Sequence, residues 1–327
     1  MKHMNVALFV PHMGCKNACI FCNQRIISGK SCPLTPEQVI SAAEIAARTP
    51  HDIENSEIAF FGGSFTAIEE ERMISYLEAA KPYIGTQFSG IRISTRPDCI
   101  DERKLAVLKE YGVTAIELGA QSMSDTVLEK NRRGHSAADT VRASRLIRRQ
   151  GFSLGLQMMT GLYGSDAAAE LYTAQSFIGL SPDTVRIYPT TVLEGTELCR
   201  LYQEKKYIPP DFSAAVELCA ELLELFYENN IKVIRLGLHS GGNVEEGFVA
   251  GVYHPAFREL CEGVIYRKKI DSLLAGMPRG SYTVFVNGRE LSKARGQKKC
   301  NIAYFSALGK ELCIQARDTL SVYEVSL

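Results

Sequence analysis

The chain has 327 residues, which is enough for one large α/β barrel or for two ordinary domains. Hydrophobic residues make up 46% of it and charged residues 23%, a composition that predicts a globular protein with a sizeable core. Lysine and arginine together number 37, as do aspartate and glutamate, so no net charge favours nucleic acid or an anionic membrane as a partner.

No apolar stretch approaches the roughly 20 residues of a membrane span. The first residues, MKHMNVALFVPH, contain one short apolar run, which indicates a first strand and not a signal peptide. We therefore expect a cytoplasmic protein with no membrane contact. In that reducing compartment, closely spaced cysteines more often bind metal or act in catalysis than form disulfides.

Apolar strand-like runs alternate with helical patterns through the first part of the chain. Strands are predicted at residues 5–10, 57–61, 91–95, 113–119, 152–159 and 184–188. Helices are predicted near residues 36–48, 67–83, 101–111, 136–150 and 166–178. The first helix has a clear start, because Thr35 can cap it, Pro36 suits its first position and Gln38 completes a capping box.

Strands that alternate with helices predict a parallel sheet with right-handed crossovers. Six such units indicate an α/β fold, a partial (β/α)6 barrel open on one side, although the pattern also fits an open doubly wound sheet. The rhythm changes after Pro189. Beyond it, the sequence predicts helices within 196–230 and near 255–275 and 299–308, and strands at 232–238, 281–287, 311–316 and 319–325. We expect a barrel domain over residues 1–195 and a smaller helical and α+β region over 196–327.

The stretch PHMGCKNACIFCNQ, residues 11–24, follows the first predicted strand and contains Cys15, Cys19 and Cys22. Functional groups of parallel α/β folds lie on the loops at the C-terminal ends of strands, which is where these cysteines fall. Three thiolates can hold three irons of a [4Fe–4S] cube and leave the fourth iron open. The alternatives are a zinc site with His12 as fourth ligand, or three unconnected buried cysteines.

The C-x3-C-x-aromatic-C spacing, with Phe21 as the aromatic residue, resembles that of the radical S-adenosylmethionine (SAM) enzymes. Residues 5–240 resemble the radical SAM domain of the catalytic subunit of the Elongator complex, and more distantly the anaerobic coproporphyrinogen dehydrogenases. The segments that carry the resemblance are FFGGSFTAIE (60–69), STRPD (94–98), IELGAQSMSDTVLEKNRRGHS (116–136), QMMTGLYG (157–164) and RIYPTTVLEGTEL (186–198).

The resemblance implies a [4Fe–4S] cluster on Cys15, Cys19 and Cys22 whose open iron binds the amino and carboxylate groups of SAM. One electron through the cluster would cleave SAM to methionine and a 5′-deoxyadenosyl radical, which abstracts a hydrogen atom or adds to a substrate. The protein supplies ligation, orientation and exclusion of water. This chemistry implies a low-potential electron donor of the flavodoxin or ferredoxin type.

Two pairs of residues at strand ends correspond to the family's SAM pocket. Gly62 and Gly63 end the second strand, where the family contacts the methionyl amino group; two glycines also suit an ordinary tight turn. Ser64 follows them and favours a hydroxyl or backbone contact. Ser94 and Thr95 end the third strand, where related enzymes place a polar side chain on the ribose or methionyl part of SAM.

Three further positions match family residues that reach the cofactor. Gln121 ends the fourth strand, and Gln157 aligns with a ribose contact. Arg133 is expected to fork onto the SAM carboxylate, unless it belongs to a solvated basic run from Lys130 to Arg133.

Strand alternation places Glu117 and Arg186 on polar faces that would line the barrel interior. They either neutralise each other or position the cofactor or substrate. His135 and His239 read as hydrogen-bonded structural histidines that could instead contact substrate or nucleotide.

The C-terminal region contains a basic stretch, NGRELSKARGQKKC (287–300), whose Lys293, Arg295, Lys298 and Lys299 could receive the phosphates of tRNA. A solvated loop is the plainer interpretation. The other seven cysteines show no C-x2-C pairing and read as core or exposed thiols, with an auxiliary cluster on Cys261, Cys300 and Cys313 as a remote alternative.

The sequence thus predicts a radical SAM enzyme, and we weigh three hypotheses about its function. The first is modification of a tRNA uridine, the second a small-molecule or tetrapyrrole-like substrate, and the third a non-catalytic metal-binding protein. We expect no acetyltransferase domain, which the Elongator subunit carries after the region of resemblance.

Overall fold

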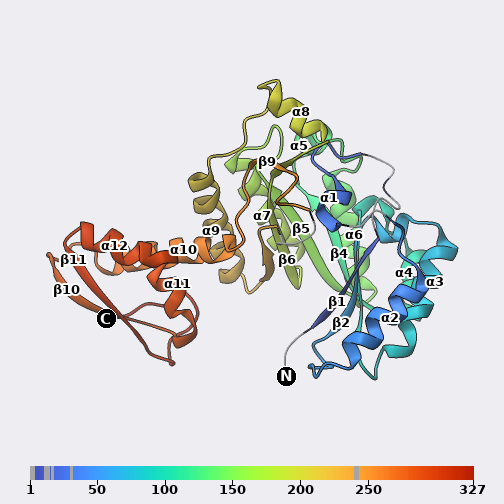
Figure 1. The fold of residues 1–327 in the computed structure, drawn as a ribbon, viewed down its shortest axis with the longest axis horizontal. Coiled ribbons are helices and arrows are strands. Elements are labelled where there is room, and N and C mark those ends of the chain that lie inside the picture. Colours follow the sequence, from blue (N-terminus) through green and yellow to red (C-terminus); the bar gives the residue numbers. More distant parts are fainter. Residues whose placement is uncertain (1–3, 11–14, 16–17, 30–31, 239–242) are drawn as a thin grey trace.

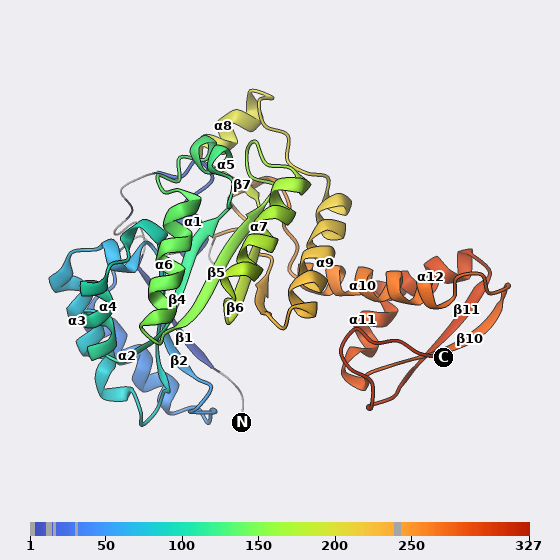
Figure 2. The same cartoon turned by 180° about the vertical axis from the view of Figure 1, so that it is seen from behind.

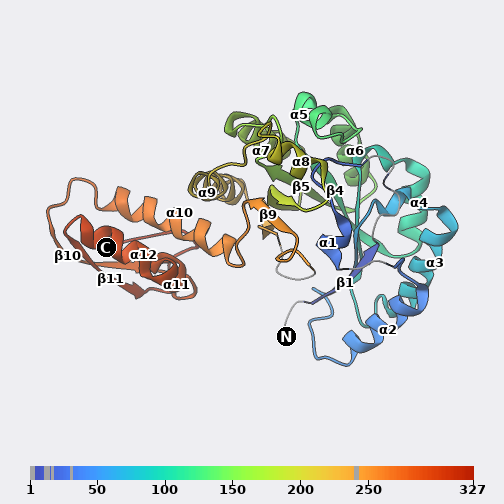
Figure 3. The ribbon, with the colours of Figure 1, turned by 45° about the horizontal axis from the view of Figure 1, so that its top comes forward.

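Seven parallel strands form the central sheet of the protein, which is known from a computed structural model describing residues 4–10, 15, 18–29, 32–238 and 243–327. Neighbouring strands follow the order β1-β2-β3-β4-β5-β6-β8, and the sheet curls into a half-barrel (Figure 3). The strands are β1 (Asn5–Val10), β2 (Glu57–Gly62), β3 (Gly90–Thr95), β4 (Val113–Gln121), β5 (Ser153–Thr160), β6 (Thr184–Pro189) and β8 (Lys232–Leu236). The predicted α/β half-barrel is therefore confirmed.

Helices cover the convex face of this sheet (Figures 1 and 2). They are α2 (Pro36–Ala47), α3 (Glu70–Ala80), α4 (Glu102–Glu110), α6 (Ala137–Arg149), α7 (Ala167–Leu180) and α9 (Phe212–Glu228). The apolar side chains of β1 that point outward, Val6, Leu8 and Val10, are buried in the main core beneath them. The predicted capping box is present, since Thr35 and Gln38 exchange side-chain to backbone hydrogen bonds of 3.1 and 3.4 Å.

Short elements at the C-terminal ends of the strands were not predicted as separate units. They are α1 (Gln24–Ser28), α5 (Asp125–Lys130), α8 (Glu197–Gln203), β7 (Thr191–Leu193) and β9 (Phe248–Gly251). The 3-10 turns are Phe65–Ala67, Lys81–Tyr83, Pro97–Cys99, Gly288–Glu290 and Gln297–Lys299. β7 and β9 pair antiparallel, apart from the main sheet.

The C-terminal part projects to one side of the half-barrel (Figure 1). It comprises α10 (Phe257–Leu273), β10 (Gly280–Val286), α11 (Leu291–Arg295), α12 (Cys300–Ala307) and β11 (Lys310–Ala316). α10 packs against α9, and β10 pairs with β11 in parallel. A smaller α+β part therefore follows the barrel, as predicted.

The predicted strand at 319–325 is wrong. Tyr323 has a left-handed backbone with φ of 59° and is only 5% exposed, because its side chain is buried against Tyr266 of α10. Its backbone N–H donates to the Tyr266 hydroxyl at 3.0 Å. The segment is therefore held by a contact with the Tyr266 side chain and not by pairing along the edge of a sheet. Ser326 of this tail forms an isolated antiparallel bridge with Phe285 of β10.

The sheet continues past residue 195, the predicted end of the barrel domain, because β8 pairs with β6 as the seventh strand. The division of the chain into domains of 1–195 and 196–327 stays a prediction. None of the helices in the described ranges combines the length and apolar character needed to cross a bilayer.

Candidate cofactor site

A cavity of about 450 Å³ lies at the C-terminal ends of the first five strands. Its walls include all ten residues that the sequence singled out for a cluster and a cofactor. These are Cys15, Cys19, Cys22, Gly62, Gly63, Ser64, Ser94, Gln121, Arg133 and Gln157. Parallel strands bring their C-terminal ends to one edge of the sheet, which explains why residues so distant in sequence meet here.

The cysteine loop is held at both sides of Ile20. The Ile20 N–H donates to the Asn131 carbonyl at 3.4 Å, and the Ile20 carbonyl accepts from the Leu198 N–H at 2.8 Å. The Ile20 side chain packs with Val192, Leu198 and Tyr207 in a small core separate from the main one. Asn131, together with Val192, Leu198 and Tyr207 from beyond β6, therefore fixes the loop between Cys19 and Cys22.

Two thiols of this loop, those of Cys15 and Cys22, have raised pKa values. Burial raises the pKa of Cys22 to about 12, and the neighbouring Cys19 and Cys15 add to the increase. Burial and then Cys19 also raise the pKa of Cys15, against the opposing effect of the Arg133 guanidinium. Because the thiolate is the form that binds metal, loading the site releases protons.

The donor set fits an iron–sulfur cube better than a single ion. In the described part of the chain, no three His, Cys, Asp or Glu side chains converge as ligands of one metal. A zinc ion needs its donors around one centre at about 2.3 Å, whereas each iron of a cube takes its own thiolate. The proposed fourth zinc ligand, His12, lies outside the described residues.

Gly62 and Gly63 form a tight wall of the cavity. Gly62 has φ of 104°, and a Cβ added there would lie 3.2 Å from the Val10 carbonyl oxygen, so only glycine suits this position. The Gly62 carbonyl accepts from Gln24 Nε2 at 3.2 Å, and the Gly63 N–H donates to the Val10 carbonyl at 2.8 Å. These two groups are therefore occupied within the protein.

Ser64 connects the glycine turn to the cysteines and to β3. Its backbone lowers the pKa of the Cys15 thiol through a hydrogen bond, against the larger effect of burial, which raises it. Its hydroxyl lies 2.8 Å from Thr95 Oγ1 and accepts from the Arg96 N–H at 3.1 Å. The Ser64 side chain is thus fixed, and its backbone supports Cys15.

Arg133 is a buried wall residue and not a member of a solvated run, because it is only 7% exposed. One terminal nitrogen donates to Cys19 Sγ at 3.0 Å and the other to the Gly119 carbonyl at 2.5 Å. Its Nε has no partner among the described residues, and neither has the buried Oε1 of Gln121, whose backbone is left-handed with φ of 68°. Two unpartnered polar atoms in a cavity wall fit a polar ligand such as SAM.

Gln157 and Ser94 connect this cavity to a charged network inside the barrel. Gln157 Nε2 donates to Glu117 Oε2 at 2.9 Å and to the Ser94 hydroxyl at 3.3 Å. Arg186 forms a bidentate pair with Glu117 at 2.6 and 2.9 Å, and Arg92 adds a bond of 3.3 Å. The neutralisation of Glu117 by Arg186, one of the two predicted alternatives, is therefore present. Burial lowers the pKa of Arg186, but the opposing effect of the Glu117 carboxylate and its neighbours is larger, so the pKa lies above its ordinary value.

Two polar residues of the cavity wall, Gln24 and Arg96, were not singled out from the sequence. Gln24 donates to Cys15 Sγ at 3.8 Å as well as to Gly62, and Arg96 forms a bidentate pair with Asp98 at 2.9 and 3.0 Å. Gln24 directly follows the cysteine motif, and Arg96 lies in the STRPD segment, so proximity to a recognised motif was the available signal.

The remaining predicted histidines and cysteines lie elsewhere. His135 is buried beside the cavity with Nε2 3.1 Å from the Ala120 carbonyl, and burial lowers its pKa to about 4. His239 lies outside the described residues. Cys261 is buried in the core, whereas Cys300 and Cys313 are exposed, so the described structure does not gather an auxiliary cluster on these three.

The C-terminal basic loop presents fewer cations than its sequence suggested. Lys293 pairs with the buried Glu262 and Glu290 at 3.1 and 3.0 Å. Arg295 donates to the Ile314 carbonyl at 3.2 Å but is exposed, as are Arg289, Lys298 and Lys299. Lys293 is therefore neutralised by buried carboxylates, and a phosphate contact stays a prediction for the exposed cations of this loop.

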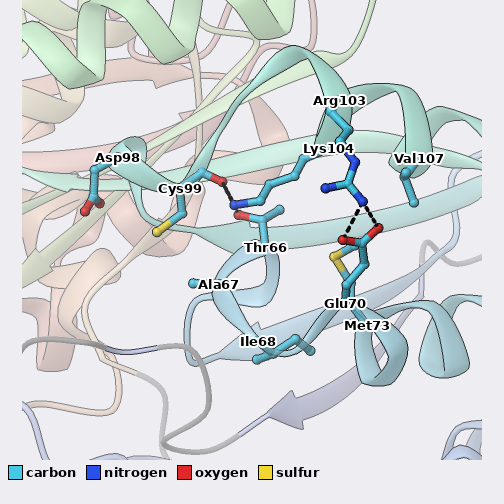
Figure 4. Close-up of a pocket in the computed structure, with 10 residues that line it drawn as sticks. All are labelled: Thr66, Ala67, Ile68, Glu70, Met73, Asp98, Cys99, Arg103, Lys104 and Val107. Carbon is cyan, nitrogen blue, oxygen red and sulfur yellow. Dashed lines mark hydrogen bonds and ion pairs between the residues drawn. The ribbon is translucent and has the colours of Figure 1, made fainter.

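A second cavity of about 320 Å³ lies between the starts of α3 and α4 (Figure 4). Thr66 joins it to the first one, since its hydroxyl lies 2.7 Å from Thr95 Oγ1 and donates to the Cys99 carbonyl at 2.7 Å. Its charged lining residues have ion-pair partners: Arg103 pairs with Glu70 at 2.7 Å, Asp98 with Arg96 and Lys104 with Asp101. Its lining includes none of the ten predicted residues.

Comparison with protein families identifies two matching regions. The model of the Radical SAM superfamily matches residues 9–172, half of the chain. The model of the Radical SAM C-terminal domain matches residues 182–267.

Relatives of known sequence cover different shares of the chain. An uncharacterized protein of Methanocaldococcus jannaschii is 31% identical over 232 residues, which is 68% of this chain and 70% of that protein. The tRNA uridine(34) acetyltransferase of Methanocaldococcus infernus is 29% identical over 205 residues, 55% of this chain and 38% of that enzyme. Elongator complex protein 3 of Homo sapiens is 28% identical over 196 residues, 54% of this chain and 36% of that protein. The chain thus matches well under two thirds of the acetyltransferase and Elongator relatives.

Among solved structures, the archaeal Elp3 of Methanocaldococcus infernus, lacking its N-terminus, superposes with a TM-score of 0.64 at 21% identity. The match covers 82% of this chain and 64% of that one. Coproporphyrinogen III oxidase from Escherichia coli, a radical SAM enzyme, gives a TM-score of 0.50 at 15% identity over 69% of this chain and 52% of that one. At these identities the likeness establishes the fold.

Proposed function

Because the chain belongs to the radical SAM superfamily and is therefore an enzyme, we propose that it holds a [4Fe–4S] cluster on Cys15, Cys19 and Cys22 and binds SAM beside it. The observation that carries this proposal is the meeting of these cysteines with seven further predicted residues around one cavity. When bound, the cluster supplies the electron that cleaves SAM to methionine and a 5′-deoxyadenosyl radical, which acts on the substrate.

The wall residues have distinct parts in this proposal. Gly62 and Gly63 allow the backbone to approach SAM closely, while Ser64 supports Cys15. Gln121 offers a free amide oxygen, and Arg133 offers its Nε to an anionic group while its terminal nitrogens contact Cys19 and Gly119. Ser94 and Gln157, fixed by Glu117, line the wall where we expect the ribose or methionyl part of SAM.

We infer that the substrate is a tRNA uridine. The support is the set of relatives named as tRNA uridine(34) acetyltransferases and Elongator proteins, which share the radical SAM region with this chain. Acetyl transfer is not part of the proposal, because the match covers only 38% of the first of these relatives. The chemistry requires a low-potential electron donor of the flavodoxin or ferredoxin type, in the cytoplasm.

Formation of 5′-deoxyadenosine tests the radical chemistry. The protein is reconstituted anaerobically with iron and sulfide, reduced with dithionite and incubated with SAM and tRNA. We expect product from the wild type and from the control Cys313→Ala, whose thiol is exposed and distant from the motif, and none from Cys19→Ala. Equal product from Cys19→Ala would refute the assignment of the cluster ligands.

Copurification tests the RNA substrate separately. Retention of tRNA through washing at high salt, together with faster SAM cleavage when tRNA is added, supports a tRNA substrate. If the protein cleaves SAM but neither binds tRNA nor responds to it, the substrate is a small molecule and the tRNA assignment is wrong.

A further inference from the structure

Within the described part of the chain, one arginine on the inner face of the half-barrel, Arg235, pairs with no carboxylate. Arg186 of β6 and Arg235 of β8 are register partners on neighbouring parallel strands, so their side chains leave the same face of the sheet. Arg186 is neutralised by Glu117 at 2.6 Å, and Arg92 by Glu57 at 2.7 Å.

Arg235 has no such partner. Among the described residues, its hydrogen bond is the one from Nε to the Gly237 carbonyl at 2.9 Å, and it forms no ion pair. The side chain is half-buried, within electrostatic range of the Tyr188 and Tyr253 hydroxyls. A half-buried cation without a counter-charge is suited to an anionic ligand.

Tyr253 lies within electrostatic range of this arginine and connects it to a second aromatic side chain, Phe248. Tyr253 approaches Phe248 of β9 with ring centroids 6.0 Å apart. Phe248 is 39% exposed and the next residue, Val249, 38% exposed, although both lie in a strand. We call Arg235, Phe248 and Tyr253 the barrel-mouth patch.

The barrel-mouth patch lies next to the cysteine loop. The segment that leads into β9 contacts α1, the helix that begins at Gln24 shortly after the cysteine motif. The Asn243 N–H donates to the Ile26 carbonyl of α1 at 3.1 Å, and Gly247 packs against the Ile26 side chain. A ligand on this patch would therefore enter the barrel on the side of the cysteines.

We propose that the barrel-mouth patch binds the single-stranded loop of the RNA substrate. Arg235 contacts a backbone phosphate, and the Phe248 ring, supported by Tyr253, stacks on an unpaired base. Exposed aromatics beside a cation are the combination by which proteins hold single-stranded RNA, since every base offers a face for stacking. This inference rests on the tRNA substrate proposed above and moves the main RNA contact from the C-terminal basic loop to the mouth of the barrel.

One acidic side chain opposes this contact. Glu245 accepts a hydrogen bond from the Tyr253 hydroxyl at 3.2 Å and is exposed. Because its charge repels a phosphate on Arg235, the substitution Glu245→Gln is expected to tighten RNA binding about twofold to threefold at low salt. Substitutions in the patch should therefore weaken RNA binding, whereas Glu245→Gln should strengthen it.

The test measures binding of a fluorescently labelled RNA hairpin, with a uridine in its unpaired loop, by polarisation over a series of salt concentrations. Arg235→Gln should weaken binding about tenfold and reduce the slope of log affinity against log salt by about 0.7, the value for one phosphate contact on a single strand. Phe248→Ala should weaken binding at least about fivefold and leave that slope unchanged.

Matched control variants remove an arginine and an aromatic side chain from the helices on the convex side of the sheet. Arg103→Gln removes an exposed arginine of α4, and Tyr172→Ala an exposed aromatic of α7; both should bind the hairpin as the wild type does. Circular dichroism confirms that each variant is folded before its affinity is compared.

Two results would overturn the inference and are distinguishable from failure of the proposed function. If the wild type binds the hairpin but Arg235→Gln and Phe248→Ala bind it equally well, the patch is not the RNA site and the tRNA substrate stands. The same conclusion holds if a double variant, Lys298→Gln with Lys299→Gln, loses binding while the patch variants do not. If the wild type binds no hairpin while it still cleaves SAM, the tRNA substrate itself is wrong.

Discussion

At the scale of single residues, Glu117 holds together the charged interior of the barrel. It is 1% exposed and accepts hydrogen bonds from Arg186, Arg92 and Gln157. Glu117→Gln would leave Arg186 without its counter-charge, whereas Arg92 keeps its pair with Glu57. Removal of one partner from a buried pair costs roughly 3 to 5 kcal/mol. Urea unfolding should show a loss of that size.

The exposed pair of Glu70 with Arg103 provides the comparison, since it lies on the outer helices. Glu70→Gln should change the free energy of unfolding by less than about 1 kcal/mol. Similar losses for the two variants would mean that solvent screens the Glu117 network.

Glu170 predicts a pH dependence of stability. Its carboxylate accepts the Gly161 N–H at 2.6 Å, yet burial raises its pKa from 4.5 to about 7. The folded protein therefore holds this proton more tightly than the unfolded chain does, and stability falls as the pH rises from 4.5 to 7 and then levels off.

This shift corresponds to about 3 kcal/mol lost between pH 4.5 and pH 8. Glu170→Gln cannot ionise and keeps an acceptor for Gly161, so unfolding curves of the variant should lack that part of the decline. Parallel pH profiles for the two proteins would show that Glu170 titrates normally.

At the scale of elements, the segment from β7 through α8 acts as a brace for the cysteine loop. Leu198 is fully buried against Ile20, and its backbone N–H donates to the Ile20 carbonyl at 2.8 Å. Leu198→Ala keeps that hydrogen bond but opens a cavity beneath the loop, at a cost of about 2 to 5 kcal/mol. We expect the variant to lose its cluster to a chelator several-fold faster than the wild type.

Leu222 of α9 is equally buried but belongs to the main core, so Leu222→Ala separates the brace from general stability. Both variants should unfold at lower urea concentration. Equal rates of cluster loss in the two would mean that the loop is not held by this segment.

Local patterns predicted the regular elements well and the brace not at all. The strands and helices of the barrel repeat alternation and capping signals that act over a few residues, as Thr35 and Gln38 do. Ile20 and Leu198 meet only through the tertiary fold, and neither residue carries a local signal of that contact. The same reason explains the error at 319–325, where alternation suggests a strand but Tyr323 anchors the tail to α10 instead.

At the scale of the whole molecule, the parallel order of the sheet determines the site. Once the strands run parallel, residues at their C-terminal ends must meet, which is why the positions of Gly62, Ser94, Gln121 and Gln157 around one cavity were predictable. Their hydrogen-bond partners were not, because Gln157 reaches Glu117 and Ser94 through the depth of the barrel. The functions of these residues toward SAM stay predictions that binding measurements must test.

The central claim is a [4Fe–4S] cluster with one iron open to SAM, held by Cys15, Cys19 and Cys22. Electron paramagnetic resonance of the anaerobically reconstituted and reduced protein tests it most directly, with spectra recorded before and after addition of SAM. We expect the signal of one reduced [4Fe–4S] cluster per chain, a change of that signal when SAM binds, and no cluster in Cys19→Ala. A protein that takes up zinc and no cluster, or a cluster whose signal ignores SAM, would contradict it.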